Sequence, residues 1–372
     1  MKKRIFFVLY SIFLILGAIF SWGFVDSNMP FRAPMWLSVL AYHQRTLATI
    51  IYGVFVLMLF GFYVYSLRQV QKKLWGIRDV WKAVGITIAI LFFSYPAFSF
   101  DVFNYIATAK VAFLYRENPY LVMPIEIPNE PMLVFLHASN KVALYGPVWI
   151  LLTSLPHYLG FGDILLSVFA FKALVIAFYI LLARLIWKIS NNAFAVAFFA
   201  LNPLVIMETL LGGHNDVVMM YLALLAFFLL QKKKLVLSLI VLGLSILIKG
   251  ATVMLVPVFV WAIGNTLKGK KNNWNIIWFW CAVSMYTIFF LSPIREEIYA
   301  WYLIWPLTFV ALIPGSPLLR YITFGFSFGL LFRIVPFLYT RQWIGITPMI
   351  KKLVTFIPPA LLAIYYEIRK NI

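Results

Sequence analysis

Residues 83–98 read AVGITIAILFFSYPAF, and residues 99–120 continue SFDVFNYIATAKVAFLYRENPY. An α-helix needs roughly 20 apolar residues to cross the hydrocarbon core of a bilayer, and the first of these runs approaches that length. Asp101 follows at the point where the span, placed at 83–100, would end. The stretch therefore predicts a membrane helix, and then an acid at the membrane surface that opens a second helix.

The rest of the chain has the same apolar character. Of its 372 residues, 64% are hydrophobic and 12% are charged, and the mean hydropathy is +0.94. Soluble domains are closer to half apolar and a quarter charged. Only helices and closed barrels cross a bilayer, and these apolar runs are continuous rather than alternating. We therefore predict an all-α, polytopic integral membrane protein without a separate soluble domain.

About twelve transmembrane helices are expected. The whole chain, 1–372, is predicted to form one transmembrane domain, with N-terminal spans in 1–82, a catalytic core in 83–293 and C-terminal spans in 294–372. The twelve expected spans lie near 5–24, 46–66, 83–100, 164–187, 192–211, 216–231, 235–249, 251–265, 274–293, 299–315, 318–338 and 352–368.

The net charge of +19 is carried by short basic clusters between the spans. With the amino terminus inside, these clusters all fall on the cytoplasmic side, which is the positive-inside pattern. They indicate a multi-pass protein of the cell membrane with anionic lipids as partners, and they argue against nucleic acid. Most acids map to the outer face: Asp101, Glu117, Glu126, Glu130, Glu208, Asp216, Glu296 and Glu297. A polar site on the outer face is therefore expected.

The connection 101–146 is the longest between spans, and connections of this length usually carry function. Its start, DVFNYIATAKVAFLY, should be helical, with Asp101 and Tyr105 on one face. After YGP, Pro147 is placed at or near the first position of a helix that lies at the outer interface. Asp101 is open to two interpretations: a cap for the helix that follows, or a general base that takes a proton from a hydroxyl.

Residues 201–220, LNPLVIMETLLGGHNDVVMM, place several polar groups at a helix break. Ionisable groups at membrane depth are costly and are candidates for function. An interfacial turn in which Asp216 caps the next helix is the simpler alternative. A metal site is a weaker one, because the spacing matches no strong metal motif. The candidates here are Glu208, His214, Asn215 and Asp216.

Cations also interrupt apolar segments. Lys249 and Lys172 lie within predicted spans, and snorkelling to an interface is the simple account of both. A cation at an outer helix end could instead hold a phosphate, and Arg116 and Lys141 in the outer connection are similar candidates. The aromatic run WYLIWPL at 301–307 fits either an interfacial belt or stacking against sugar rings.

Four stretches in order resemble a known family: SFDVFNYIATAKVAFLYRENPY, YGP, NPLVIMETLLGGHND and the lysine of IKG. Together, over about residues 95–260, they look like the bacterial α-1,6-mannosyltransferases that use polyprenyl-phosphate mannose. Those enzymes belong to the GT-C class of integral membrane glycosyltransferases. The chain departs from the family pattern at Phe100, where Arg is common, and at Glu117, where Gly is common.

The resemblance implies an inverting transfer of a sugar, with mannose as the expected one, from a polyprenyl-phosphate donor to a glycan or glycolipid acceptor on the extracytoplasmic face. It implies a large first outer loop that carries the catalytic base, Asp101, and no cofactor or metal. The donor phosphate would be bound by Arg116, Lys141, His214 and Lys249. The sugar or acceptor would be bound by Tyr105, Asn118, Tyr120, Tyr145, Glu208, Asn215 and Asp216.

Two alternatives remain open at this level. A transporter or flippase of a lipid-linked sugar would place broken helices near the midplane, often in repeated halves, whereas the polar residues here gather at outer helix ends. A ligase or polymerase that uses a polyprenyl-linked glycan shares the donor and the topology. A scaffold without catalytic function would not need ionisable groups beside its spans.

Overall fold

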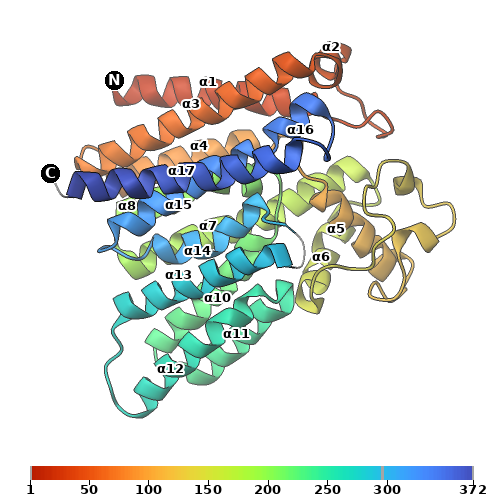
Figure 1. The fold of residues 1–372 in the computed structure, drawn as a ribbon. Coiled ribbons are helices and arrows are strands. Elements are labelled where there is room, and N and C mark those ends of the chain that lie inside the picture. Colours follow the sequence, from red (N-terminus) through yellow and green to blue (C-terminus); the bar gives the residue numbers. More distant parts are fainter. Residues whose placement is uncertain (1, 295–296, 371–372) are drawn as a thin grey trace.

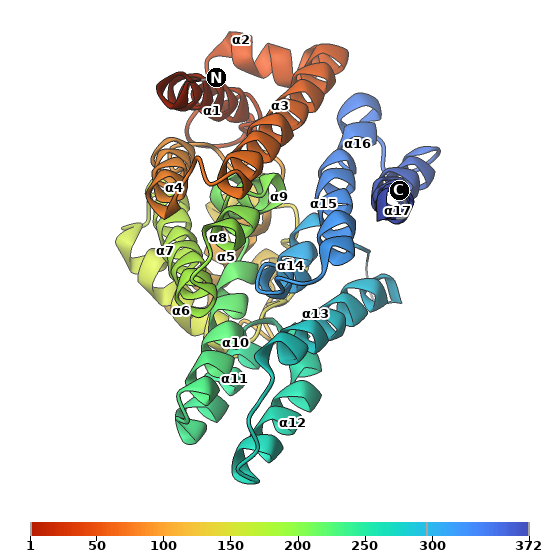
Figure 2. The ribbon, with the colours of Figure 1, turned by 90° about the vertical axis from the view of Figure 1, so that its left-hand side faces the viewer.

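The computed structural model describes residues 2–294 and 297–370, and every regular element in that part of the chain is a helix. The long helices lie side by side in one bundle, with the two termini at the same end (Figure 1). A view along the bundle places α1 to α4 on one flank and α10 to α13 on the other, with α8 and α14 between them (Figure 2). The prediction of an all-α polytopic membrane protein is confirmed.

Six helices in the described part are long and apolar enough to cross a membrane by themselves. They are α1 (Lys3–Trp22), α3 (Arg45–Gln71), α7 (Ile164–Ser190), α13 (Trp274–Leu291) with η7 (Ser292–Ile294), α15 (Pro317–Phe332) with α16 (Val335–Thr340), and α17 (Thr347–Lys370). A seventh span forms if the bent pair of α8 (Ala193–Ala200) and α9 (Pro203–Val205) with η5 (Ile206–Leu211) is counted as one.

The remaining helices are shorter. The apolar ones are α10 (Asp216–Gln231), α11 (Leu235–Lys249), η6 (Ala251–Leu255) with α12 (Val256–Leu267), and η8 (Ala300–Leu303) with α14 (Ile304–Val310). The others are α2 (Met35–Ser38), η1 (Val39–His43), α4 (Ile77–Leu91), α5 (Asp101–Ala109), η2 (Lys110–Leu114), η3 (Pro124–Glu126), η4 (Pro131–Val134) and α6 (Pro147–Leu159).

Eleven of the twelve predicted spans coincide with a helix or a consecutive helix pair, but the described residues give only six or seven full-length spans. The span predicted at 83–100 is wrong in its second half, because α4 ends at Leu91 and the chain turns before Asp101. The difference arises where the chain turns inside an apolar run, since hydropathy does not register such turns. The break between α8 and α9, for example, bends the chain by 50°. There Asn202 caps the new helix by accepting a hydrogen bond from the backbone N–H of Leu204 (2.9 Å), and Pro203 stands at its first position.

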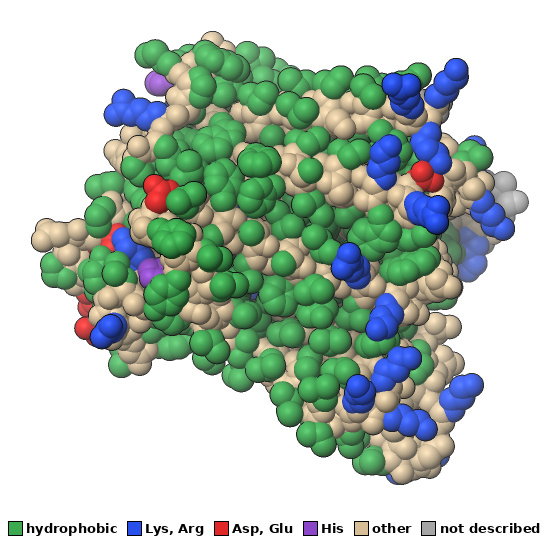
Figure 3. Space-filling view, turned by 180° about the vertical axis from the view of Figure 1, so that it is seen from behind, with side chains coloured by type: hydrophobic (Ala, Val, Ile, Leu, Met, Phe, Trp, Pro, Cys, Tyr) green, Lys and Arg blue, Asp and Glu red, His purple; other side chains and the backbone are tan. Residues whose placement is uncertain are grey.

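The two ends of the bundle differ in charge. Lysine and arginine side chains gather toward the end that holds the termini, and the acidic side chains in view lie mainly at the opposite end (Figure 3). That opposite end is built from α5, α6 and the irregular segments between them (Figure 1). The helices predicted at 101–115 and after YGP are both present there, as α5 with η2 and as α6.

Lys172 does not snorkel. Its side chain is fully buried, and its ammonium group donates hydrogen bonds to the backbone oxygen of Leu91 (2.8 Å), to the backbone oxygen of Ser94 and to the Ser94 hydroxyl (2.8 Å). These acceptors lie where α4 ends, and helix ends leave backbone oxygens without helical partners. Lys172 on α7 therefore fixes the segment between α4 and α5, which leads into Asp101.

Candidate active site

Asp101 is the first residue of α5, and its side chain is 18% exposed. The capping position is held by Phe100, and the Asp101 carboxylate accepts no backbone hydrogen bond of the helix start in the structure. Instead, Asp101 Oδ2 accepts a hydrogen bond from the Tyr145 hydroxyl at 2.7 Å, and the Tyr105 hydroxyl lies 3.5 Å away. The capping interpretation of Asp101 is therefore wrong, and its carboxylate is oriented by two phenols.

The position of Tyr145 depends on Gly146. The backbone N–H of Gly146 donates to the oxygen of Ile248 near the end of α11 (2.8 Å), and a Cβ at Gly146 would lie 2.1 Å from the Leu247 oxygen. Only glycine allows this close backbone approach. Pro147 then starts α6, as predicted. The YGP motif thus joins the end of α11 to the beginning of α6 and places Tyr145 between Asp101 and Lys249.

His214 lies behind Asp101 and is fully buried. Its Nδ1 is 2.9 Å from the backbone oxygen of Glu208 and 3.2 Å from Glu208 Oε2, while its Nε2 is 2.9 Å from the Ser99 hydroxyl and 3.7 Å from Asp101 Oδ2. A backbone oxygen only accepts, so Nδ1 carries the proton of the neutral ring and Nε2 accepts from Ser99. Burial lowers the pKa of His214, against the raising effect of Asp101 and Asp216.

The connection that holds His214 is pressed against α5. Gly213 has a φ of 71°, and a Cβ there would lie 2.6 Å from a methyl group of Val102. This conformation and this contact both favour glycine. The glycine pair of GGHND therefore does more than end a helix, because it brings the imidazole of His214 to the side of Asp101.

Lys249 and Asp216 form an ion pair. Lys249 Nζ lies 3.0 Å from each carboxylate oxygen of Asp216, and the Trp305 indole N–H donates to Asp216 Oδ1 at 2.6 Å. Asp216 is fully buried, whereas the Lys249 side chain is 13% exposed. Asn215 occupies the capping position of α10, so the interpretation of Asp216 as a simple helix cap is wrong. The snorkelling account of Lys249 is replaced by the ion pair.

These groups line or border a cavity of about 660 Å³, which we call the Asp101 cavity. This volume lies within the range of small-molecule sites, roughly 300–1,000 Å³. Aromatic rings form much of its wall, and His214 stacks behind one of them, Trp301, with centroids 4.0 Å apart. The polar and aromatic lining consists of Asp101, Asn104, Lys141, Tyr145, Lys249, Ser292, Tyr299, Trp301, Tyr302 and Trp305.

Two amides have buried polar atoms without a hydrogen-bond partner in the described structure. They are Asn104 Oδ1 and both side-chain polar atoms of Asn215. Buried polar atoms are almost always hydrogen-bonded, so these positions are suited to a water molecule or a ligand hydroxyl. Asn104 lines the Asp101 cavity, and the backbone N–H of Asn215 donates to the Tyr105 hydroxyl (3.4 Å).

The structure does not bring all the predicted residues together. Asp101, Lys141, Tyr145 and Lys249 line the Asp101 cavity, with Tyr105, His214, Asn215 and Asp216 directly behind it, while Glu208 reaches His214 from the other side. Arg116, Asn118 and Tyr120 are exposed and are not among the residues that line this cavity. The Tyr120 hydroxyl donates to the Tyr145 backbone oxygen (2.9 Å), so it supports the loop rather than the cavity wall.

Several residues of the site were not predicted as site residues, among them Ser99, Asn104, Tyr299, Trp301, Tyr302 and Trp305. The run 301–307 was recognised only as aromatic, and Trp305 proves to be a buried hydrogen-bond donor to Asp216. Ser99 and Asn104 lack a sequence signal, because isolated hydroxyls and amides are common in helices and turns.

The fold and the site together define an all-helical membrane protein with a polar, aromatic-walled cavity at one end of its bundle. A family described as "Alpha-(1->6)-mannopyranosyltransferase, N-terminal domain" matches residues 6–265. The chain belongs to this family and is a glycosyltransferase, as the resemblance implied. No curated protein and no solved structure matches it.

Proposed function

We propose that this protein is an inverting mannosyltransferase of GT-C architecture, with the division into N-terminal spans, catalytic core and C-terminal spans given above. It moves mannose from a polyprenyl-phosphate donor to a hydroxyl of a glycan or glycolipid acceptor on the outer face of the cell membrane. One observation carries the proposal: in a chain of the mannosyltransferase family, a carboxylate held by two phenols faces a cavity large enough for a sugar.

In this mechanism Asp101 takes the proton of the acceptor hydroxyl. The acceptor oxygen forms a bond to the anomeric carbon, and the bond from that carbon to the phosphate oxygen breaks, with the electron pair leaving on the lipid phosphate. Tyr145 supports the base, because burial and the neighbouring Asp101 raise the pKa of its phenol well above the usual value and keep it a hydrogen-bond donor. Lys141 lines the same cavity and would offset charge on the leaving group, beside Lys249, whose own charge is paired with Asp216.

The outer face is proposed from the separation of charge along the bundle. The basic end carries the termini, and the Asp101 cavity lies at the other end, so the positive-inside rule supports a cavity on the outer face. Anionic lipids would contact the basic end, and nucleic acid is not expected as a partner. The sequence implies neither a cofactor nor a metal.

The test is a transfer assay with purified protein, a membrane extract as acceptor, and either polyprenyl-phosphate mannose or GDP-mannose. Transfer from the lipid donor alone supports the proposal. Transfer from GDP-mannose alone would refute the donor class and the outer face. Transfer of a whole glycan from a polyprenyl carrier, but not of mannose, would favour the ligase or polymerase, and movement of the lipid-linked sugar without transfer would favour the flippase.

Asp101→Asn should reduce transfer by about 10²- to 10⁴-fold, which is the usual contribution of a general base. Glu117→Gln is the matched control, since Glu117 is an exposed acid of the same outer segment that does not line the cavity. Substantial residual transfer by Asp101→Asn would refute the assignment of the base. EDTA should leave transfer intact, and loss that manganese or magnesium restores would show that a carboxylate of the site binds a metal.

A further inference from the structure

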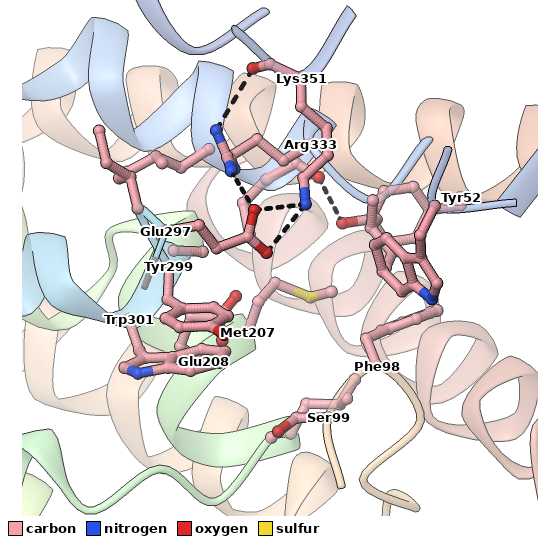
Figure 4. Close-up of a pocket in the computed structure, with 18 residues that line it drawn as sticks. Tyr52, Phe98, Ser99, Met207, Glu208, Glu297, Tyr299, Trp301, Arg333 and Lys351 are labelled. Atoms are coloured by element: carbon pink, nitrogen blue, oxygen red, sulfur yellow. Dashed lines mark hydrogen bonds and ion pairs between the residues drawn. The ribbon is translucent and has the colours of Figure 1, made fainter. Parts of the chain in front are cut away.

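A second cavity, of about 160 Å³, lies on the other side of the aromatic wall and contains its own cluster of charges (Figure 4). We call it the Glu297 cavity. Tyr299 and Trp301 line both cavities, and their rings stack with centroids 4.6 Å apart and planes 7° apart. The Glu297 cavity is formed between α3, η5, α15 and α17, so residues from both ends of the sequence contribute to it.

Its charges are unequal. Arg333 Nη2 lies 3.0 Å from Glu297 Oε2, and Lys351 Nζ lies 2.9 and 2.7 Å from the two oxygens of the same carboxylate. The side chains of Arg333 and Lys351 are only 12% and 11% exposed, whereas that of Glu297 is 42% exposed. Two nearly buried cations thus share one carboxylate that faces outward. Buried charge is costly unless it is paired, so this arrangement favours a further anion.

The other acid of the cavity is not bonded to these cations in the described part of the chain. Glu208 lines the same space, but its neighbour there is the neutral ring of His214, whose Nδ1 is 3.2 Å from Glu208 Oε2. Each cation also has a second partner that holds it in place. Arg333 Nη1 donates to the Thr355 hydroxyl at 2.8 Å, and Lys351 lies over the ring of Trp343, 4.9 Å from its centroid. The two donors are therefore preorganised around the position of the Glu297 carboxylate.

The chemistry of this pair suits a phosphoryl group. Guanidinium presents a planar fork of donors to phosphate oxygens, and lysine adds a compact charge. A buried water needs roughly 10–15 Å³, so the 160 Å³ of this cavity is enough for a phosphoryl group with several waters. It is much smaller than the Asp101 cavity, which is the one with room for sugar rings.

We propose that the Glu297 cavity is an anion subsite in which Arg333 and Lys351 bind a phosphoryl group and Glu297 competes with it for the two cations. The choice of a lipid phosphate as the natural occupant rests on the function proposed above, because both the donor and the leaving group carry one. Binding of a phosphoryl group as such does not depend on transfer.

The experiment measures equilibrium binding to the full chain, purified in a neutral detergent. The probes are a short-chain prenyl phosphate, the corresponding prenol, and inorganic phosphate. Arg333→Gln and Lys351→Gln should each weaken prenyl-phosphate binding by about tenfold or more, since each removes charge-assisted hydrogen bonds. Glu297→Gln should strengthen it about three- to tenfold, because the competing charge is removed and its exposure screens part of the effect. Lys352→Gln, an exposed neighbour, is the matched control and should bind as the wild type does.

The opposite signs separate binding from a structural role. If the three residues only stabilised the fold, Glu297→Gln would lower the affinity for prenyl phosphate, as the two cation variants do. The Glu297→Gln variant also keeps the test decisive if Arg333→Gln does not fold. Tighter binding of prenyl phosphate than of inorganic phosphate, with no binding of prenol, supports a lipid phosphate. Equal binding of both phosphates with the same variant pattern supports the subsite and refutes the lipid as its occupant. Binding unaffected by the cation variants, or weakened by Glu297→Gln, would overturn the proposal.

Binding can also be measured on Asp101→Asn, which separates this inference from the proposed function. If the wild-type protein binds prenyl phosphate through Arg333 and Lys351 but transfers no mannose, the anion subsite is supported and the proposed function is refuted. If the protein transfers mannose but its phosphate binding does not depend on these two cations, the proposed function is supported and the anion subsite is refuted.

Discussion

The ion pair between Lys249 and Asp216 gives the sharpest stability prediction, because its two members differ in burial. In Lys249→Met, the Asp216 carboxylate stays fully buried and keeps, among the residues that the structure describes, only the Trp305 indole as a side-chain donor. Leaving one partner of a buried ion pair without the other costs about 3–5 kcal/mol. Lys249→Met should therefore be strongly destabilising.

Asp216→Asn should cost less. The Lys249 side chain is 13% exposed to the Asp101 cavity, and its ammonium group lies 5.2 to 5.9 Å from the ring centroids of Tyr145, Trp301 and Tyr302. Contact of a cation with aromatic faces stabilises by about 0.5–2 kcal/mol, and an asparagine oxygen still accepts from Trp305. We expect the free energy of unfolding of Asp216→Asn to fall by about 1–2 kcal/mol, since the aromatic rings around Lys249 still compensate part of the lost ion pair.

The double variant tests the reasoning directly. With both charges removed, no unpaired charge remains buried, so Asp216→Asn with Lys249→Met should be no less stable than Lys249→Met alone. Residues in contact are expected to be non-additive in this way. Lys234→Met, an exposed lysine next to the other end of α11, is the control and should change stability by less than about 0.5 kcal/mol.

The assay is thermal unfolding in detergent, followed by near-ultraviolet circular dichroism at one fixed scan rate. For a chain of this length 1 kcal/mol corresponds to roughly 1–2 °C, so Lys249→Met should lower the midpoint by about 3–10 °C. If Asp216→Asn lowered it more than Lys249→Met, or if the two losses simply added in the double variant, the ion pair would not carry the stability assigned to it.

Three further perturbations follow from the same region. Gly146→Ala should lose about 1–3 kcal/mol because its Cβ meets the backbone of α11, whereas Gly243→Ala, within α11 and without any neighbour inside 4 Å, should be neutral or slightly stabilising in the same unfolding assay. Tyr145→Phe should lower the rate of mannose transfer about tenfold or more by removing a charge-assisted hydrogen bond, and Tyr105→Phe, at 3.5 Å, should have a smaller effect; equal rates would argue against the orienting role. Burial lowers the pKa of His214 below its usual 6.5 in the folded protein. As the pH falls below 6.5, the unfolded chain therefore binds a proton at His214 more readily than the folded chain does. The contribution of the neutral His214 to the free energy of unfolding is thus present above pH 6.5 and lost below it. His214→Gln should therefore unfold with a weaker dependence on pH between about 7 and 5, and an unchanged dependence would contradict a buried neutral ring.

The local features of the site were predictable because they depend on short-range geometry. Asp101 and Tyr105 are four residues apart, so any helix through them brings the two side chains to one face. Pro147 after a glycine predicted the start of α6. Ionisable groups beside apolar runs indicated His214 and Asp216 as candidate site residues.

The pairings could not be predicted, since they depend on how helices far apart in the sequence pack. Lys249 and Asp216 are 33 residues apart, and Asp216 and Trp305 are 89 residues apart. Arg333 lies within the predicted span 318–338, and it proves to be one of the charges that build the Glu297 cavity.

The same point bears on where a phosphate binds. The resemblance offers Arg116, Lys141, His214 and Lys249 as candidates, each expected at the outer end of the bundle. In the structure the charge of Lys249 is matched by Asp216, and Arg116 is not among the residues that line the Asp101 cavity, which leaves Lys141 as the lysine there without an ion pair among the described residues. In the Glu297 cavity, by contrast, two nearly buried cations, Arg333 and Lys351, share the single carboxylate of Glu297. Since the attraction for an anion depends on the charge that remains after pairing, the second cavity is the better place to look for a bound phosphoryl group.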